Sequence, residues 1–363
     1  MWERVKYWME TRIGLDDLVR SQVTDYRVPK NINIFYTLGF VAAAGYLIQV
    51  LSGILLLIYY VPHPDHAFKS VQFIMHKVPF GWLFRQMHVV GSNLMIAAIG
   101  LHMLTVFAMG NYKRPRELTW IGGALLLFVT IAFGFSGYLL PWTQLSYWAT
   151  TVVTSIPTAV PVVGDFVAGI LRGGDQVTGA TLSRFFAFHV SILPPLFMLL
   201  VGIHLFLIKR IGISATPFGL HAEEKRPWTE YHKKSHADGY PYYPRFFQMD
   251  MLMVMVYLAV MFALITITPN LFFPEEATIP ANPFKTPVTV RPEWYLLAPY
   301  QMLKIIPNKF LGIIIQLALF LVFLLWPFFD TEKEKNIMKR PLLRGLFLFS
   351  FVLWLILMFW GRS

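Results

Sequence analysis

The chain contains no cysteine among its 363 residues. It therefore has no disulfide bond, no thiolate-ligated metal and no iron–sulfur cluster of its own, and no haem can be attached to it through thioether bonds. Ten histidines are present. Any metal bound by this chain has to be held by these histidines or by carboxylates.

Charged residues are scarce as well, at 14% of the chain, whereas 56% of the residues are hydrophobic and the mean hydropathy is +0.54. A soluble domain usually carries about 25% charged residues. The surplus of apolar residues predicts an integral membrane protein. In such a protein the net charge of +11 reflects orientation and contact with anionic lipids, and it does not indicate nucleic-acid binding.

Seven stretches lack Asp, Glu, Lys and Arg, and each can hold one membrane-spanning helix of ~20 residues. We therefore expect an all-α integral membrane protein with seven transmembrane helices. The third stretch contains three prolines, so its second half is interpreted as short surface helices, and the last is short unless residues 342–344 join it. The stretches are 31–64, 86–112, 118–164, 185–208, 251–274, 310–329 and 345–361.

The order of these stretches predicts four parts: an amphipathic surface helix region at 1–30 without a signal peptide, a four-span bundle at 31–210, a hydrophilic linker at 211–247 and a three-span domain at 248–363. Most Lys and Arg residues fall on the side of the N-terminus, which places that side and the linker in the cytoplasm. His232 and His236 could share a metal if the linker is helical there, but a solvated linker is the preferred interpretation.

Four histidines lie inside the apolar stretches. His88 and His102 are fourteen residues apart in the second stretch, and His189 and His204 are fifteen apart in the fourth. A helix turns by ~100° and rises by ~1.5 Å per residue, so each pair keeps roughly one face and spans ~21–22 Å of depth.

Both stretches run from outside to inside, so His88 is level with His189 and His102 with His204. Two facing imidazoles at each of two depths suit bis-histidine ligation of two haems. The alternatives are buried histidines hydrogen-bonded to neighbouring helices, or a proton relay in a secondary transporter.

Glycines repeat the same axial period. Gly39 and Gly53 in the first stretch, and Gly123 and Gly137 in the third, are each fourteen residues apart. Glycine lets a flat macrocycle approach the backbone. Ordinary packing of small residues between membrane helices is the alternative.

Basic residues flank the histidines. Arg85 and Arg184 precede the outer pair and could bind haem propionates, or they could be interface anchors. Lys209 and Arg210 follow His204 and are interpreted mainly as topology determinants, with propionate or quinone contact as a second possibility.

The residues also carry a family resemblance over nearly the whole chain. The histidine quartet and six motifs resemble the cytochrome b subunit of quinol-oxidising cytochrome bc1 and b6f complexes. The motifs are SVQFIMHKVPFGWLFRQMH (70–88), KRPRELTW (113–120), GYLLPW (137–142), LSRFFAFH (182–189), ANPFKTP (281–287) and RPEWY (291–295).

This resemblance implies two non-covalent b haems, an outer low-potential one on His88 and His189 and an inner high-potential one on His102 and His204. It implies quinol oxidation at an outer site and quinone reduction at an inner site. It also implies a Rieske iron–sulfur protein and a c-type cytochrome as partners, a dimeric complex, and an energy-coupling membrane such as the bacterial inner membrane.

The resemblance is mixed. Several motifs are similar to the photosynthetic branch, in which the four-span and three-span parts are separate chains, but here the parts are fused. Thr37 stands where that branch has a haem-tethering cysteine, and Thr105 stands where it has a basic residue. A covalent third haem is therefore not expected, and the inner propionate contact falls to Lys209, Arg210 or Arg114.

By the same resemblance Glu293 accepts a proton from quinol, and Tyr138 and Tyr300 line its pocket. The sequence alone leaves Glu293 equally interpretable as a residue at a helix start, and the tyrosines as interfacial aromatic residues. Asp250 is the candidate proton donor of the inner site, or else a simple helix-N-terminal Asp. A di-haem quinol dehydrogenase subunit with another partner is the nearer alternative; it would lack the PEWY segment.

Overall fold

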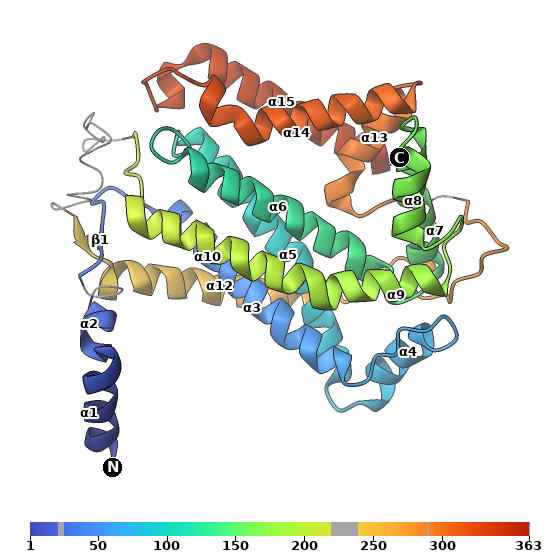
Figure 1. Ribbon diagram of the computed structural model, residues 1–363, viewed down its shortest axis with the longest axis horizontal. Coiled ribbons are helices and arrows are strands. Elements are labelled where there is room, and N and C mark those ends of the chain that lie inside the picture. The colour runs from blue at the N-terminus through green and yellow to red at the C-terminus, as the bar shows by residue number, and fades with distance from the viewer. Residues whose placement is uncertain (21–24, 219–238, 289, 363) are drawn as a thin grey trace.

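The computed structural model describes residues 1–20, 25–218, 239–288 and 290–362. Figure 1 shows long helices packed into one bundle, with short helices at its ends. The elements in chain order are α1 (Trp2–Ile13), α2 (Leu15–Val19), β1 (Arg27–Val28), η2 (Ile34–Thr37), α3 (Leu38–Leu57), α4 (Ala67–Lys77), α5 (Gly81–Ala108), α6 (Glu117–Tyr138), α7 (Gln144–Ser155), η3 (Ile156–Ala159), α8 (Gly164–Arg172), α9 (Gly179–Ala187), η4 (Phe188–Ile192), α10 (Leu193–Ile211), β2 (Tyr240–Pro241), η5 (Tyr242–Phe246), α12 (Phe247–Ile267), η6 (Glu275–Ala277), η7 (Trp294–Leu296), α13 (Leu297–Ile305), α14 (Lys309–Phe329), η8 (Ile337–Lys339) and α15 (Pro341–Arg362).

Seven helices of the described chain are long and apolar enough to cross a membrane, which confirms the predicted all-α membrane fold. The second half of the third apolar stretch forms the short helices α7 and η3, as expected, and α8 begins where the stretch ends. The spans are Ile34–Leu57, Gly81–Ala108, Glu117–Tyr138, Gly179–Ile211, Tyr242–Ile267, Lys309–Phe329 and Pro341–Arg362.

The first four spans pack as two pairs, α3 with α5 and α6 with α10, and the three later spans lie around them. α12 packs on α3 and α5, whereas α14 packs on α6. The core between α5 and α6 is built from large apolar side chains, including Met103, Trp120 and Phe197.

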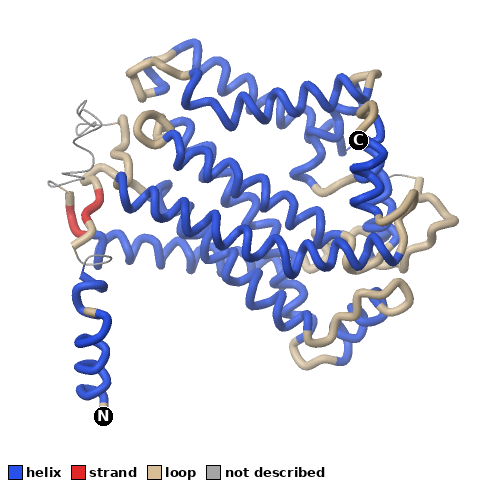
Figure 2. Tube along the Cα trace, viewed as in Figure 1, coloured by secondary structure: helices blue, strands red, loops and turns tan. Residues whose placement is uncertain are grey.

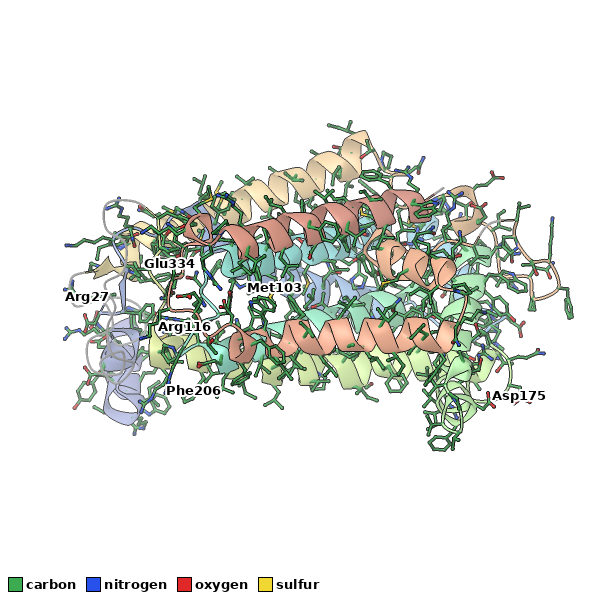
Figure 3. All side chains as sticks on the ribbon, turned by 90° about the horizontal axis from the view of Figure 1, so that it is seen from above. Arg27, Met103, Arg116, Asp175, Phe206 and Glu334 are labelled. Carbon is green, nitrogen blue, oxygen red and sulfur yellow. The ribbon has the colours of Figure 1, made fainter. Side chains whose placement is uncertain are left out.

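The two ends of the bundle carry different residues. Figure 3 places Arg27, Arg116 and Glu334 at one end and Asp175 at the other. We call the first the inner end and the second the outer end, after the predicted orientation. α1 lies beside the inner end and runs across the direction of the spans (Figure 1), as a helix on a membrane surface would.

Two predicted boundaries need correction. The segment predicted as the linker, 211–247, contains β2 near its end, where Pro241 and Tyr240 pair antiparallel with Arg27 and Val28 of β1. This pair is the only sheet within the described residues (Figure 2). The fifth span then starts at Tyr242 and not at residue 251.

The seventh span includes residues 342–344, because Pro341 begins α15. Proline is tolerated in the first turn of a helix, where its missing N–H has no intrahelical partner. The histidines of the linker, His232 and His236, lie outside the described residues.

A buried ionic cluster joins the α5–α6 loop to the segment between α14 and α15. Lys113 Nζ lies 2.7 Å from Asp330 Oδ2, and the two side chains are 7% and 3% exposed. Arg340 donates two hydrogen bonds to the same carboxylate, at 2.6 and 2.8 Å, and the Tyr112 hydroxyl donates another. The three-span part is thereby fixed to the four-span part at the inner end.

Candidate functional site

Two histidines from neighbouring spans face each other toward the outer end. His88 lies on α5 and His189 on η4, and their ring centroids are 6.2 Å apart with 73° between the ring planes. A bond between a metal and an imidazole nitrogen is about 2 Å long, so two rings that ligate one metal from opposite sides stand about 6 Å apart. The separation of this pair fits one metal ion between the rings.

Glycines of the two other spans lie against this outer pair. A Cβ atom added at Gly53 of α3 would be 3.2 Å from Cε1 of His88. One added at Gly137 of α6 would be 2.6 Å from Cε1 of His189, closer than real Cβ atoms come. The sequence placed these glycines at a macrocycle wall, whereas the structure puts them beside the histidine rings.

The inner histidines also have a glycine against each ring. A Cβ atom at Gly39 of α3 would be 3.2 Å from Cε1 of His102, and one at Gly123 of α6 would be 3.4 Å from Cε1 of His204. Each of the four glycines thus faces the histidine of its own depth. The bundle thus places one glycine beside each of the four histidines, as the shared period of the glycines and of His88 and His102 suggests.

Neither histidine pair has a third metal-binding side chain beside it in the described chain. Within the described residues there is no group of three or more His, Cys, Asp or Glu side chains that could hold a metal ion. A bare structural metal usually takes four protein ligands. Two opposed imidazoles with no third protein ligand fit a metal whose remaining ligands come from a planar macrocycle, as in haem.

A π-turn explains the unequal spacing of the histidines. The span Gly179–Ile211 is interrupted by η4, a single π-helical turn that contains His189. A π-turn holds one residue more than an α-turn, so it absorbs the extra residue between His189 and His204. Pro194 and Pro195 follow directly; they lack the N–H groups that would bond back into the previous turn.

Serine hydroxyls hold the outer histidine rings. Ser52 Oγ lies 2.9 Å from His88 Nδ1, and Ser136 Oγ lies 3.1 Å from His189 Nδ1. Both serines are buried. Because Nδ1 is used in each ring, Nε2 is the nitrogen left to bind a metal.

Gln49 of α3 holds the main chain of His88. With its amide oriented to satisfy both partners, its nitrogen donates to the His88 carbonyl at 2.8 Å and its oxygen accepts from Ser92 N at 3.0 Å. The amide thus bonds to the His88 carbonyl and the Ser92 N–H, two groups that are four residues apart and that pair with each other in a regular helix. A Cβ atom at Gly91 would be 2.5 Å from this amide, so the glycine makes the insertion possible.

The two predicted outer arginines differ in their surroundings. Arg85 is close to His88 in sequence, and its guanidinium stacks 4.5 Å from the centre of the Phe273 ring. It has no carboxylate partner among the described residues. Arg184 instead donates to the carbonyls of Gly169, at 3.2 Å, and Ile170 at the end of α8. Both hydrogen bonds use Nη1 and tie Arg184 to α8, and its role as a propionate ligand stays a prediction.

Of the inner basic residues, Lys209 lies over an aromatic ring, with Nζ 5.1 Å from the centre of Tyr26. Arg210 is exposed at the end of α10. The structure leaves both near the inner end.

Glu293 lies at the start of η7, in the loop that leads to α13. It is the N-cap residue of η7, so it does stand at a helix start, but its side chain makes no capping hydrogen bond. Burial raises the pKa of Glu293 to about 7. A carboxyl group with this pKa can release and accept protons near neutral pH.

Two tyrosines share the surroundings of Glu293. Tyr138, the last residue of α6, interacts electrostatically with both Glu293 and Tyr295. The Tyr295 hydroxyl contacts the position where a Cβ atom of Gly134 would stand. Burial, and then the charge of Glu293, raise the pKa of Tyr295. The predicted pair Glu293 and Tyr138 therefore does come together.

The same segment is tied to α5, because the Trp294 indole donates to Asn93 Oδ1 at 2.8 Å. Tyr300, predicted to line the pocket, lies on α13 and donates to the carbonyl of Val290 at 3.3 Å. Its hydroxyl thus bonds to the loop that precedes Glu293.

At the inner end Asp250 is 2% exposed and accepts a hydrogen bond of 2.7 Å from the Tyr242 hydroxyl. Its other carboxylate oxygen is buried without a hydrogen-bond partner in the described chain. The Tyr242 ring is 6.3 Å from Tyr26, over which Lys209 lies. The predicted inner residues Asp250 and Lys209 are therefore connected through two tyrosines.

Sequence reasoning missed Ser52, Ser136, Gln49 and Tyr295. The serines had a signal: each directly precedes the glycine at the outer depth, so the dipeptide Ser-Gly occurs once in α3 and once in α6. At the inner depth the residues before the glycines are Leu38 and Gly122. Gln49 had no comparable signal, because nothing in the pattern shows where it points.

Comparisons with known proteins agree with this geometry. The family model "Cytochrome b/b6/petB" matches residues 23–212, and "Cytochrome b(C-terminal)/b6/petD" matches residues 280–363. Cytochrome b of Rickettsia conorii is 36% identical over 94% of this chain and 82% of its own length. Cytochrome b of Allochromatium vinosum is 36% identical over 95% of this chain and 86% of its own length.

A bacterial relative from Chlorobaculum thiosulfatiphilum, described as a cytochrome bc complex cytochrome b subunit, is 36% identical over 97% of this chain and 79% of its own length. Among solved structures, a chain of a hyperthermophilic respiratory Complex III has a TM-score of 0.89 and 39% identity, and the match covers 98% of this chain and 91% of that chain. The likeness therefore extends over both the four-span and the three-span parts.

Proposed function

The chain belongs to the cytochrome b family, and from that premise we propose that it oxidises quinol at its outer end and reduces quinone at its inner end, with two b haems held between them. At the coarser level it is a multi-pass membrane protein, a cytochrome b of a bc complex and part of an oxidoreductase that binds haem b. Haem b, when bound, supplies one-electron redox chemistry.

The observation that carries the proposal is the outer pair, two imidazoles 6.2 Å apart on separate spans, each with a glycine against its ring. We assign His88 and His189 as the outer ligands and His102 and His204 as the inner ones. Gly53, Gly137, Gly39 and Gly123 provide the space beside the four rings. Arg85, which has an aromatic neighbour but no acidic partner in the described residues, is the candidate for an outer propionate.

Glu293 is proposed as the acceptor of a quinol proton. Its carboxyl group is largely buried, has a pKa of about 7 and lies near the phenols of Tyr138 and Tyr295. A general base is most effective when its pKa is close to the working pH. Tyr300 would support the loop that carries Glu293 rather than touch the proton itself.

At the inner end Asp250 is proposed as the proton donor to quinone, because one of its oxygens is buried without a partner in the described chain. Lys209 and Arg210 would attract the anionic form of the quinone or a haem propionate. The direct partners are proposed to be a Rieske protein and a c-type cytochrome in a dimeric complex, as the likeness to Complex III suggests.

Replacement of single ligands tests the assignment. His88→Leu should remove one b haem, the outer one, and His102→Leu should remove the other, as measured by haem per chain and by reduced-minus-oxidised optical spectra of the purified protein. His76→Leu is the control, since His76 is exposed on α4 and its ring hydrogen-bonds to Gln72 of the same helix. Two low-spin haems per chain in either ligand variant would contradict the pairing.

A further inference from the structure

The outer and inner histidines differ in what holds their Nδ1 atoms. Each outer histidine has a buried serine hydroxyl at Nδ1, Ser52 at 2.9 Å and Ser136 at 3.1 Å. At the inner depth Nδ1 of His102 is buried without a hydrogen-bond partner in the described chain. Nδ1 of His204 is likewise buried without a hydrogen-bond partner in the described chain. Among the described residues, no hydroxyl group therefore bonds to Nδ1 of an inner histidine.

The proton positions at the outer pair follow from the other contacts of the serines. The Ser52 hydroxyl donates its single proton to the Ile48 carbonyl, at 2.7 Å. It can then only accept at His88, so Nδ1 carries the proton and Nε2 has the free electron pair. The Ser136 hydroxyl likewise donates to a main-chain carbonyl, that of Phe133 at 3.2 Å, and accepts from His189 Nδ1.

A hydrogen bond from Nδ1–H to an acceptor makes the imidazole a more basic ligand. A more basic axial ligand favours the oxidised, more highly charged iron, and such hydrogen bonds are one of the means by which a protein sets a haem potential. The hydroxyls act at one depth only, so they act on one of the two sites.

We propose that Ser52 and Ser136 are positioning residues that fix the tautomer and raise the basicity of His88 and His189, and so make the outer haem harder to reduce than the inner one. The inference rests on the proposed haem ligation. Beyond that ligation, the inference explains why two chemically identical haems would differ in reduction potential within one bundle: the serines of two Ser-Gly dipeptides act on the outer haem alone.

The test is a redox titration of the purified complex carrying Ser52→Ala or Ser136→Ala. We expect both variants to keep two haems per chain, the outer-haem midpoint potential to rise in each and to rise further in the double variant, and the inner-haem potential to stay unchanged. Ser92→Ala is the matched control, because Ser92 lies on α5 close to His88 but its hydroxyl donates to the Val89 carbonyl of its own helix. Ser52→Thr keeps the hydroxyl and should keep the potential.

An unchanged outer potential in both alanine variants, or an equal shift of both haems, would overturn the proposal. If Ser52→Ala loses the outer haem, Ser52→Thr decides: a haem-bearing threonine variant with the original potential supports the role of the hydroxyl, and one with the alanine-like potential refutes it. Failure of the ligand assignment is seen separately, because His88→Leu would then retain both haems.

Discussion

Each end of the bundle contains a largely buried carboxylate, and the two differ in their partners. At the outer end Glu293 makes no capping hydrogen bond, and burial raises its pKa to about 7. At the inner end burial also acts to raise the pKa of Asp330, but hydrogen bonds from Arg340, Lys113 and Tyr112 outweigh it and hold the pKa well below its usual range. The same burial thus produces a group that can exchange protons in one place and a permanent anion in the other.

The histidine pairs repeat this contrast between the ends. The outer pair is held by two serine hydroxyls, and the main chain of His88 by the Gln49 amide. The inner pair has glycines at the same positions but no such hydroxyls. Equal helix periodicity therefore sets where the sites are, and the polar neighbours set how they differ.

The largest effect is expected at Glu293. Glu293→Gln keeps the shape but cannot accept a proton, so quinol oxidation should slow by about 10²–10⁴-fold. The measurement is the pre-steady-state rate at which quinol reduces the outer haem, with the inner site blocked. This rate should rise with pH through about 7 in the original protein and should not rise in this range in the variant.

Protein stability gives an independent check on the same group. The folded pKa of Glu293 is above its ordinary value of 4.5, so the folded state binds more protons and unfolding free energy falls as pH rises from about 4.5 to about 7. Glu293→Gln should remove this dependence. Unchanged rates and pH profile in the variant would exclude Glu293 from the proton path.

The converse is expected at Asp330. Asp330→Asn leaves Lys113 and Arg340 buried without their anion, which should lower the free energy of unfolding by about 3–5 kcal/mol. Because the folded pKa is depressed, the stabilisation is present above the ordinary pKa of 3.8 and is lost as pH falls toward the folded value. Denaturation in detergent as a function of pH measures both effects.

A surface pair in the same loop is the control for Asp330. Lys339 and Glu334 are 4.0 Å apart, and their side chains are 70% and 37% exposed. Lys339→Ala should therefore cost less than about 1 kcal/mol. An equal cost in the two variants would mean that the buried cluster contributes no more than an exposed ion pair.

Steric room beside the rings should also differ between the ends. Gly137→Ala would place Cβ 2.6 Å from the His189 ring, so we expect loss of most of the outer haem. Gly123→Ala would place Cβ 3.4 Å from the His204 ring, an ordinary contact, and should leave both haems bound. Haem per chain and optical spectra at matched membrane levels compare the two; equal retention would show that the glycines are ordinary packing residues.

Much of this arrangement could be predicted from the sequence because depth in a membrane helix is encoded in residue spacing. His88 and His102, and the glycines with the same period, needed only the rise of a helix to be placed at two levels. The seven spans needed only their lack of charge. The extra residue between His189 and His204 was visible as well, but its cause, a π-turn ahead of two prolines, was not.

The unpredicted contacts join residues that are distant in sequence. Tyr112 and Asp330 are 218 positions apart, and Trp294 and Asn93 are 201 apart. No local pattern shows which charged residue of one loop meets which of another. The burial of Lys113 against Asp330 therefore could not be predicted from the sequence.

The smallest effect is expected where Gln49 enters α5. Gly91→Ala would bring Cβ within 2.5 Å of the Gln49 amide, and the amide, at the end of a flexible side chain, has to move away from the His88 carbonyl and Ser92 N. Two hydrogen bonds worth about 1 kcal/mol each are lost, and alanine returns ~1 kcal/mol of helix propensity, so the net cost should be about 1 kcal/mol. In a Gln49→Ala background the Ser92 N–H can bond directly to the His88 carbonyl. Gly91→Ala should then be neutral or slightly stabilising, because alanine favours a helix by ~1 kcal/mol over glycine.

Gly100→Ala supplies the inner-end counterpart of this cycle. Gly100 lies on the same helix beside His102, and a Cβ atom there meets nothing within 4 Å. Its replacement should be neutral or stabilising whether or not Gln49 is present. Thermal denaturation of the four combinations of Gln49 and Gly91 gives the coupling energy, and a coupling near zero would mean that the amide does not hold the histidine's main chain. A measurable coupling of Gln49 with Gly91, and none with Gly100, would instead show that the Gln49 side chain takes the place of a main-chain hydrogen bond of α5 at the outer histidine and not at the inner one.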